Sequence, residues 1–179
     1  MELSPIQYFT ISIIPVLLAI TVHEAAHGYA AKYFGDKTAY FLGRITLNPI
    51  KHIDPVGTVV IPGMLLLLSA PFLFGWAKPV PVNFSNLNNP KKDMMWVALA
   101  GPASNLVMAI IWAIILGLFK SSGASYALFV IGMAQVGIMI NLVLMLLNLL
   151  PIPPLDGGRM AVSLLPSPWS YKLASIERY

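Results

Sequence analysis

Residues 6–31 have the sequence IQYFTISIIPVLLAITVHEAAHGYAA. The first part is apolar and uncharged, and three ionisable side chains, His23, Glu24 and His27, follow within about one helical turn. Because a membrane-spanning helix needs about 20 mostly apolar residues, we predict a transmembrane helix over residues 6–31. Ionisable residues inside such a helix are energetically expensive, so we expect these three to be functional.

The composition of the whole chain also indicates a membrane protein. Of its 179 residues, 58% are hydrophobic and 10% are charged, whereas a soluble domain carries about 25% charged residues. No basic run is longer than the pair Lys91 and Lys92, so nucleic acid is not an expected partner. The composition excludes an ordinary soluble domain, a disordered tail and a nucleic-acid-binding module. The expected surroundings are a lipid bilayer.

Three further segments, 56–75, 94–119 and 125–150, contain no Asp, Glu, Lys or Arg. The first of them is interrupted by proline and glycine, at Pro62, Gly63, Pro71 and Gly75, so it predicts either a re-entrant segment or a fourth span. Residues 77–93 include Pro-Val-Pro-Val and predict a short extended or β element. The predicted fold is an all-α polytopic membrane protein with three transmembrane helices plus the re-entrant or fourth segment.

The HEAAH motif at residues 23–27 has the spacing of a metal site. On a helix, positions i and i+4 lie on one face, so His23 and His27 can bind one metal ion at about 2.0–2.1 Å. Glu24 stands beside them and can take a proton from a metal-bound water. The chain has no cysteine, so every ligand has to be His, Asp or Glu. This pattern favours zinc.

A catalytic zinc usually has three protein ligands, and two histidines leave one missing. Asp156 is the candidate that differs from the other acids, because it follows the longest uncharged run and lies in NLLPIPPLDGG, residues 148–158. The three prolines end the preceding helix, and the two glycines allow tight turns. Asp156 is either the third ligand or a helix cap near the surface.

These motifs resemble the site-2 protease family of intramembrane zinc metalloproteases. HEAAH followed far downstream by NLLPIPPLDGG carries the resemblance, together with GPASN at residues 101–105, which is similar to that family's GPxxN element. The stretches 43–58 and 75–83 resemble a bacterial and archaeal branch of the family that lacks a PDZ domain.

The resemblance implies a set of roles. His23, His27 and Asp156 are the expected ligands of one Zn²⁺ per chain, Glu24 is the expected general base, and Asn148 is expected to hold substrate or stabilise the oxyanion. The implied activity is hydrolysis of peptide bonds within or near transmembrane segments of membrane proteins. Residues 1–179 are expected to form a single intramembrane metalloprotease domain, truncated before a further C-terminal transmembrane helix.

The basic residues predict an orientation. If residues 56–75 re-enter, ten of the eleven Lys and Arg lie on the face reached at Lys32, and only Lys120 lies on the other; four full spans split them five against six. The positive-inside rule favours the first arrangement, which also places Asp156 on the same face as the histidines. We therefore expect a multi-pass protein of the cell membrane whose active site lies in the bilayer toward the cytoplasm.

Some assignments stay open at this point. Asn105 and Asn141 are polar residues within apolar helices. Asn141 is expected to hydrogen-bond between helices, and Asn105 either does the same or supports the active site. The alternative function is a metal or proton transporter or channel that uses the His/Glu/Asp cluster as an ion path. Oligomerisation is possible, but no oligomeric state is predicted.

Overall fold

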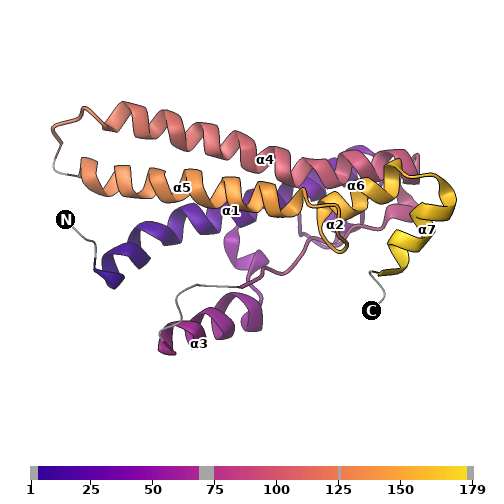
Figure 1. Ribbon diagram of the computed structural model, residues 1–179, viewed down its shortest axis with the longest axis horizontal. Coiled ribbons are helices and arrows are strands. Elements are labelled where there is room, and N and C mark those ends of the chain that lie inside the picture. The colour runs from indigo at the N-terminus through magenta and orange to yellow at the C-terminus, as the bar shows by residue number, and fades with distance from the viewer. Residues whose placement is uncertain (1–3, 69–74, 125, 177–179) are drawn as a thin grey trace.

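The computed structural model describes residues 4–68, 75–124 and 126–176. Three long helices, α1 (Pro5–Tyr33), α4 (Pro90–Phe119) and α5 (Ala127–Asn148), pack against one another along the long axis of the molecule (Figure 1). The shorter elements are α2 (Thr38–Phe41), the helical turns η1 (Pro49–His52) and η2 (Pro55–Val60), α3 (Ile61–Leu67), the turn η3 (Phe84–Asn86), α6 (Asp156–Leu164) and α7 (Ser167–Ser175).

The helices predicted at residues 6–31, 94–119 and 125–150 are confirmed as α1, α4 and α5, with residue 125 outside the described residues. α1 begins at a capping box, in which Ser4 and Gln7 each bond the other's backbone N–H. α4 begins earlier than predicted, at Pro90, because a proline fits the first helical turn, where its missing N–H costs nothing.

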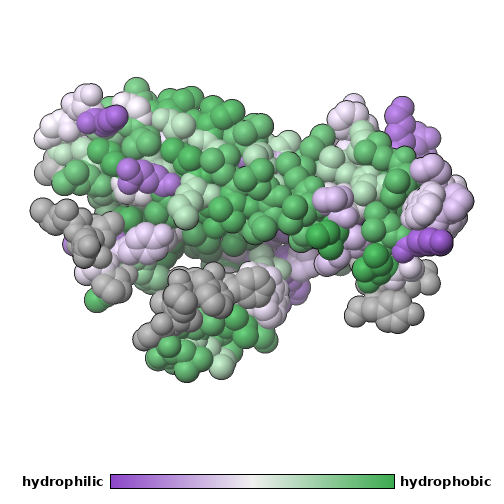
Figure 2. All heavy atoms as spheres, in the orientation of Figure 1, coloured by the Kyte–Doolittle hydropathy of each residue, from purple (hydrophilic) through white to green (hydrophobic). Residues whose placement is uncertain are grey.

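All three long helices are long and apolar enough to cross a membrane. The 30 residues of α4 extend about 45 Å at 1.5 Å per residue, which exceeds the roughly 30 Å hydrocarbon core of a bilayer. Figure 2 shows hydrophobic residues covering the middle of this bundle, and side chains such as Leu118 (72% exposed) and Leu128 (78%) point away from it. An apolar surface of this extent is typical of a protein that faces lipid.

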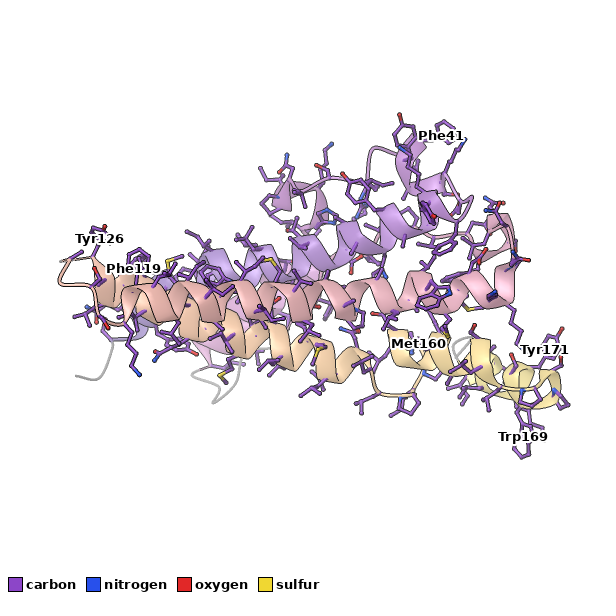
Figure 3. All side chains as sticks on the ribbon, turned by 90° about the horizontal axis from the view of Figure 1, so that it is seen from above. Phe41, Phe119, Tyr126, Met160, Trp169 and Tyr171 are labelled. Atoms are coloured by element: carbon purple, nitrogen blue, oxygen red, sulfur yellow. The ribbon has the colours of Figure 1, made fainter. Side chains whose placement is uncertain are left out.

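Aromatic side chains lie at both ends of the long axis. Phe119 and Tyr126 stand at the turn between α4 and α5, with ring centroids 6.0 Å apart, and Trp169 and Tyr171 lie on α7 at the opposite end (Figure 3). Tyr and Trp favour the level of the lipid headgroups. Their positions are those expected of a bundle whose two ends reach the headgroup regions on either side of the hydrocarbon core.

The proline- and glycine-rich segment begins and ends at the same place. The Trp76 N–H donates to the Gly57 carbonyl (3.1 Å), and the Thr58 hydroxyl donates to the Trp76 carbonyl (2.8 Å). Between these ends the structure describes η2 and the short helix α3, which packs chiefly against η2 and lies apart from the three long helices (Figure 1). The remainder, residues 69–74, lies outside the described residues.

The β element predicted within residues 77–93 does not form, and no strand occurs in residues 4–68, 75–124 or 126–176. Residues 75–83, here called the extended segment, form neither helix nor strand, and the backbone of Asn83 is extended. Their backbone hydrogen bonds do not make a ladder. Pro79 and Pro81 have no N–H, the Val80 N–H donates to a side chain, and the Lys78 N–H donates singly to the His52 carbonyl. The rest of the segment forms η3 and the start of α4.

Asp36 ties the extended segment to the end of α1. Its buried carboxylate accepts hydrogen bonds from the backbone and hydroxyl of Thr38, from the Asn83 N–H and from the Asn86 amide. Burial raises the pKa of Asp36, but these hydrogen bonds outweigh it and leave the pKa below its ordinary value. An ionised Asp36 therefore holds residues 83–86 close to the C-terminal end of α1.

Candidate metal centre

The two histidines of HEAAH project from one face of α1, as the i, i+4 spacing predicts. Their Nε2 atoms are 3.1 Å apart, and both side chains are buried, with 7% and 9% of His23 and His27 exposed. Both histidines belong to the C-terminal part of α1. This part of the helix lies away from the turn that joins α4 to α5 (Figure 1).

Asp156 reaches the histidines because a tight loop after α5 leads into α6, which packs against α4. α5 ends at Asn148, and the proline-rich stretch 151–154 leads into α6, which begins at Asp156. The loop between α5 and α6 is tight. A Cβ on Gly157 would lie 2.3 Å from the Leu149 carbonyl oxygen, and one on Gly158 would lie 2.4 Å from the Pro153 nitrogen. Glycine is therefore required at both positions, and the cap alternative for Asp156 gives way to a buried carboxylate facing α1.

The three predicted ligands form a nearly equilateral triangle. Oδ2 of Asp156 lies 3.3 Å from Nε2 of His23 and 3.2 Å from Nε2 of His27. Donors at about 2.0–2.1 Å from a tetrahedral zinc are about 3.3–3.4 Å apart. The Asp156 Oδ2 atom is buried without an aligned hydrogen-bond donor, so a cation is the natural partner for it. The donor set and its spacing therefore fit zinc.

α4 supports both imidazoles from the other side. Nδ1 of His27 lies 2.8 Å from the Val97 carbonyl oxygen, and Nδ1 of His23 lies 2.6 Å from Oδ1 of Asn105. Gly101 lies between these two supports, at the i+4 position from Val97, and a Cβ there would lie 2.4 Å from Nε2 of His27. The missing side chain at residue 101 is what lets α4 approach the histidines this closely.

Glu24 points toward the extended segment. Its Oε2 atom accepts a hydrogen bond of 2.7 Å from the Val80 N–H. The segment is held from outside by Arg44, whose guanidinium donates to the carbonyl oxygens of Lys78 (3.0 Å) and Pro79 (3.2 Å). The Glu24 carboxylate thus has a fixed partner on one oxygen.

A cavity of about 160 Å³ joins these groups. Its lining includes the triangle of His23, His27 and Asp156, and also Glu24, Asn148, residues of the extended segment and Arg159. The Asn148 amide donates one N–H to the Leu144 carbonyl (3.0 Å), and the Arg159 guanidinium lies 5.1 Å from the centre of the Phe84 ring. The structure therefore gathers all five predicted site residues around one space.

The family assignment rests on this site and on the similarity of the sequence to known proteins. Residues 11–128 and 115–175 match the model of peptidase family M50. The chain belongs to peptidase family M50, the site-2 proteases. The chain is 42% identical to YwhC of Bacillus subtilis, over 96% of this chain and 79% of that protein. It is 32% identical to Rip2 of Mycolicibacterium smegmatis, over 86% of this chain and 58% of that protein.

Both relatives are named "Putative zinc metalloprotease", and no solved structure was found to match the chain. The predicted family, enzyme class and zinc cofactor are confirmed: this M50 peptidase is a membrane zinc metalloprotease. The individual roles of its site residues stay predictions.

Several contacts of the M50 site were not predicted. The spacing of HEAAH gives no sign of Val80, because a backbone N–H carries no sequence signature. Gly101 and Asn105 both lie in the GPASN motif, and of these only Asn105 was considered as support for the site. Arg159 enters the prediction only within the count of basic residues for the orientation, although it directly follows LDGG, residues 155–158, at the start of α6.

Proposed function

We propose that this M50 peptidase hydrolyses peptide bonds within or next to transmembrane segments of membrane proteins. The observation that carries the proposal is the buried triangle of His23, His27 and Asp156, with Glu24 on the same cavity, beside three helices apolar enough to span a membrane. Such a site offers metal-assisted hydrolysis to a substrate that reaches it from the bilayer.

In this proposal His23, His27 and Asp156 would hold the zinc ion, and Glu24 moves the proton. Bound zinc supplies a Lewis acid and lowers the pKa of water at the site. Glu24 takes the proton of the attacking water and delivers it to the leaving nitrogen. Because the Val80 N–H occupies Oε2, we assign Oε1 to the proton transfer. The hydrogen bond to Oε2 keeps the carboxylate from turning away.

Asn148 is proposed to stabilise the carbonyl oxygen of the bond being broken. Its amide has two N–H donors, and one of them is used by the Leu144 carbonyl. That bond fixes the plane of the amide on the cavity wall, where the other N–H can donate to the developing negative charge.

The substrate has to reach the site as an unwound chain, because a helix hides its carbonyl groups. Pairing of that chain along the edge of residues 79–82 is restricted: Pro79 and Pro81 offer no N–H, and Val80 gives its N–H to Glu24. An incoming strand can therefore use the remaining carbonyl oxygens and the Val82 N–H. Proline in place of Val82 tests whether this edge takes part in binding.

The orientation is proposed from the charges and from the shared ends of the proline- and glycine-rich segment. Because Gly57 and Trp76 are hydrogen-bonded, that segment returns to the face it left, so α1, α4 and α5 are the spans and the metal centre lies toward the cytoplasm. The chain has no cysteine, so single cysteines at the exposed positions Ser85 and Ser122 can be labelled cleanly. Labelling from opposite sides of the membrane is expected, and labelling of both from one side contradicts the orientation.

Metal removal tests the reaction itself. The purified chain in proteoliposomes, with a single-span membrane protein as substrate, is expected to lose cleavage when a chelator strips the metal and to regain it with one equivalent of Zn²⁺ per chain. Cleavage products are followed by mass spectrometry. Cleavage that survives complete metal removal contradicts the proposal. So does zinc flux into the liposomes without any cleavage, which identifies an ion pathway instead.

A further inference from the structure

Two fully buried asparagines connect α5 to the metal centre on α1. Asn141 of α5 donates from Nδ2 to the carbonyl of Gly137 (2.8 Å), and its Oδ1 accepts from Nδ2 of Asn105 on α4 (2.9 Å). Asn105 also donates from Nδ2 to the carbonyl of Ala19 (3.2 Å), and its Oδ1 lies 2.6 Å from Nδ1 of His23. Neither asparagine is exposed to any extent. The bonds therefore form one continuous chain across three helices, which lie side by side in Figure 1.

The direction of these hydrogen bonds is set by backbone carbonyl groups, which can only accept a hydrogen bond. A carbonyl oxygen has no proton to give, so the amide nitrogen of Asn141 has to face Gly137, which leaves its oxygen facing Asn105. The nitrogen of Asn105 then has to face both Asn141 and the Ala19 carbonyl. Turning either amide over would set two acceptors against each other in a buried place, at the full cost of an unsatisfied polar group.

At the end of this series of hydrogen bonds, Asn105 therefore presents an acceptor atom to His23. Because Oδ1 of Asn105 accepts, Nδ1 of His23 has to carry the imidazole proton, and its Nε2 is left with a free lone pair. His27 reaches the same state through the Val97 carbonyl, which is also only an acceptor. Both Nε2 lone pairs point toward Asp156, where a metal ion needs them.

We propose that Asn105 is a positioning residue of the metal centre, which sets the Nδ1–H tautomer of His23 and so presents its Nε2 to zinc. The proposal rests on His23 being a zinc ligand, as proposed above. Asn141 has the secondary role of holding the Asn105 amide in the required direction. Partners of this kind orient metal-binding imidazoles and raise their basicity, and their loss costs about 10–100-fold in metal affinity.

The first test observes the tautomer directly. The chain has three histidines, and ¹⁵N-histidine NMR of the metal-stripped protein in detergent separates the two ring nitrogens of each. His52 is an internal reference, because its Nε2 lies 3.0 Å from the Thr46 carbonyl, which gives it the opposite, Nε2–H tautomer. In Asn105→Leu, His23 is expected to lose its preference for Nδ1–H, while His27 keeps its Nδ1–H tautomer through the Val97 carbonyl and His52 keeps its spectrum. An unchanged His23 tautomer overturns the proposal.

The second test compares zinc affinities by competition with a chromophoric chelator. Asn105→Leu is expected to lower the affinity about 10–100-fold, and Asn141→Leu, a change of the same size at an equally buried site that does not touch His23, by clearly less. Equal losses in the two variants overturn the proposal, because they show that the asparagines act only by joining helices.

Asn105→Asp keeps the inference testable if the leucine variant does not fold. Aspartate loses the two donated bonds but still accepts from Nδ1 of His23. It is expected to keep the tautomer and most of the zinc affinity, even where the protein is less stable. Loss of the Nδ1–H tautomer in folded Asn105→Asp overturns the role assigned to Asn105. If His23→Ala binds zinc as tightly as the unaltered chain, the ligand assignment itself is wrong, and this result is distinguishable from the others.

Discussion

Glu24→Gln is expected to lower peptide-bond cleavage by about 10²–10⁴-fold while zinc stays bound. Glutamine has nearly the same shape as glutamate, and its carbonyl oxygen can still accept the hydrogen bond from the Val80 N–H, so the surroundings of the site are kept. It cannot take a proton from water. General base catalysis contributes about 10²–10⁴-fold to a rate, and a loss of this size is expected in kcat/KM for a membrane substrate, with the zinc content of the purified protein unchanged.

Asp54→Asn is a suitable control for the removal of one negative charge. Asp54 caps η2 by accepting from the Val56 and Gly57 N–H groups, and asparagine serves equally well as a helix cap. Its cleavage rate is expected to equal that of the unaltered chain. Cleavage at the normal rate by zinc-loaded Glu24→Gln contradicts the assignment of Glu24 as the base.

Gly101→Ala is expected to lower the zinc affinity by about 100-fold or more. This is at or above the upper end of the loss seen when a residue that only supports the ligands is changed. The added Cβ would lie 2.4 Å from Nε2 of His27 and 2.6 Å from Cε1 of His23, far inside van der Waals contact. Neither ring can swing away without breaking its Nδ1 hydrogen bond to α4. Either the imidazoles or the two helices have to move, and the triangle of ligands is lost in both cases.

Gly117→Ala is the matched control for this substitution. Gly117 lies on the same helix, and a Cβ there meets nothing within 4 Å. Because alanine favours a helix over glycine by about 1 kcal/mol, Gly117→Ala is expected to bind zinc normally and to be at least as stable to thermal unfolding. Zinc binding by Gly101→Ala that equals the control contradicts the close packing of α4 against the histidines.

Much of the fold could be predicted because a membrane restricts the choices. A long uncharged segment such as 94–119 has few alternatives to a helix in lipid, and α4 is found there. The structure of residues 77–93 was harder to predict. Pro79 and Pro81 predicted an extended or β element, and the structure has no strand in the described part of residues 77–93, because strand pairing depends on where each N–H finds an acceptor. The acceptors are the Glu24 side chain on α1 and the His52 carbonyl at the end of η1, which local sequence does not reveal.

The contacts of the site also divide into those that the sequence could predict and those that it could not. His23 and His27 could be paired from the sequence because both lie on one helical turn, so their distance is set by helix geometry. The supports of these rings could not be placed, because Asn105 is 82 residues from His23 and Val97 is 70 residues from His27. Val80 is 56 residues from Glu24. Contacts at such separations depend on how helices cross and in which register.

The sequence by itself therefore determined the apolar spans and the pairing of the two histidines on one helix face, and it predicted Glu24 as the base and, through resemblance, Asp156 as the third ligand. Only the tertiary structure decided how these residues meet. Gly157 and Gly158 let the start of α6 pack closely against the loop that follows α5, so that Asp156 faces α1, and Gly101 lets α4 come close enough to hold both imidazoles. The physical reason is that periodicity acts along one helix, whereas the metal centre requires close packing of several elements, which depends on the space left by small residues far apart in the chain.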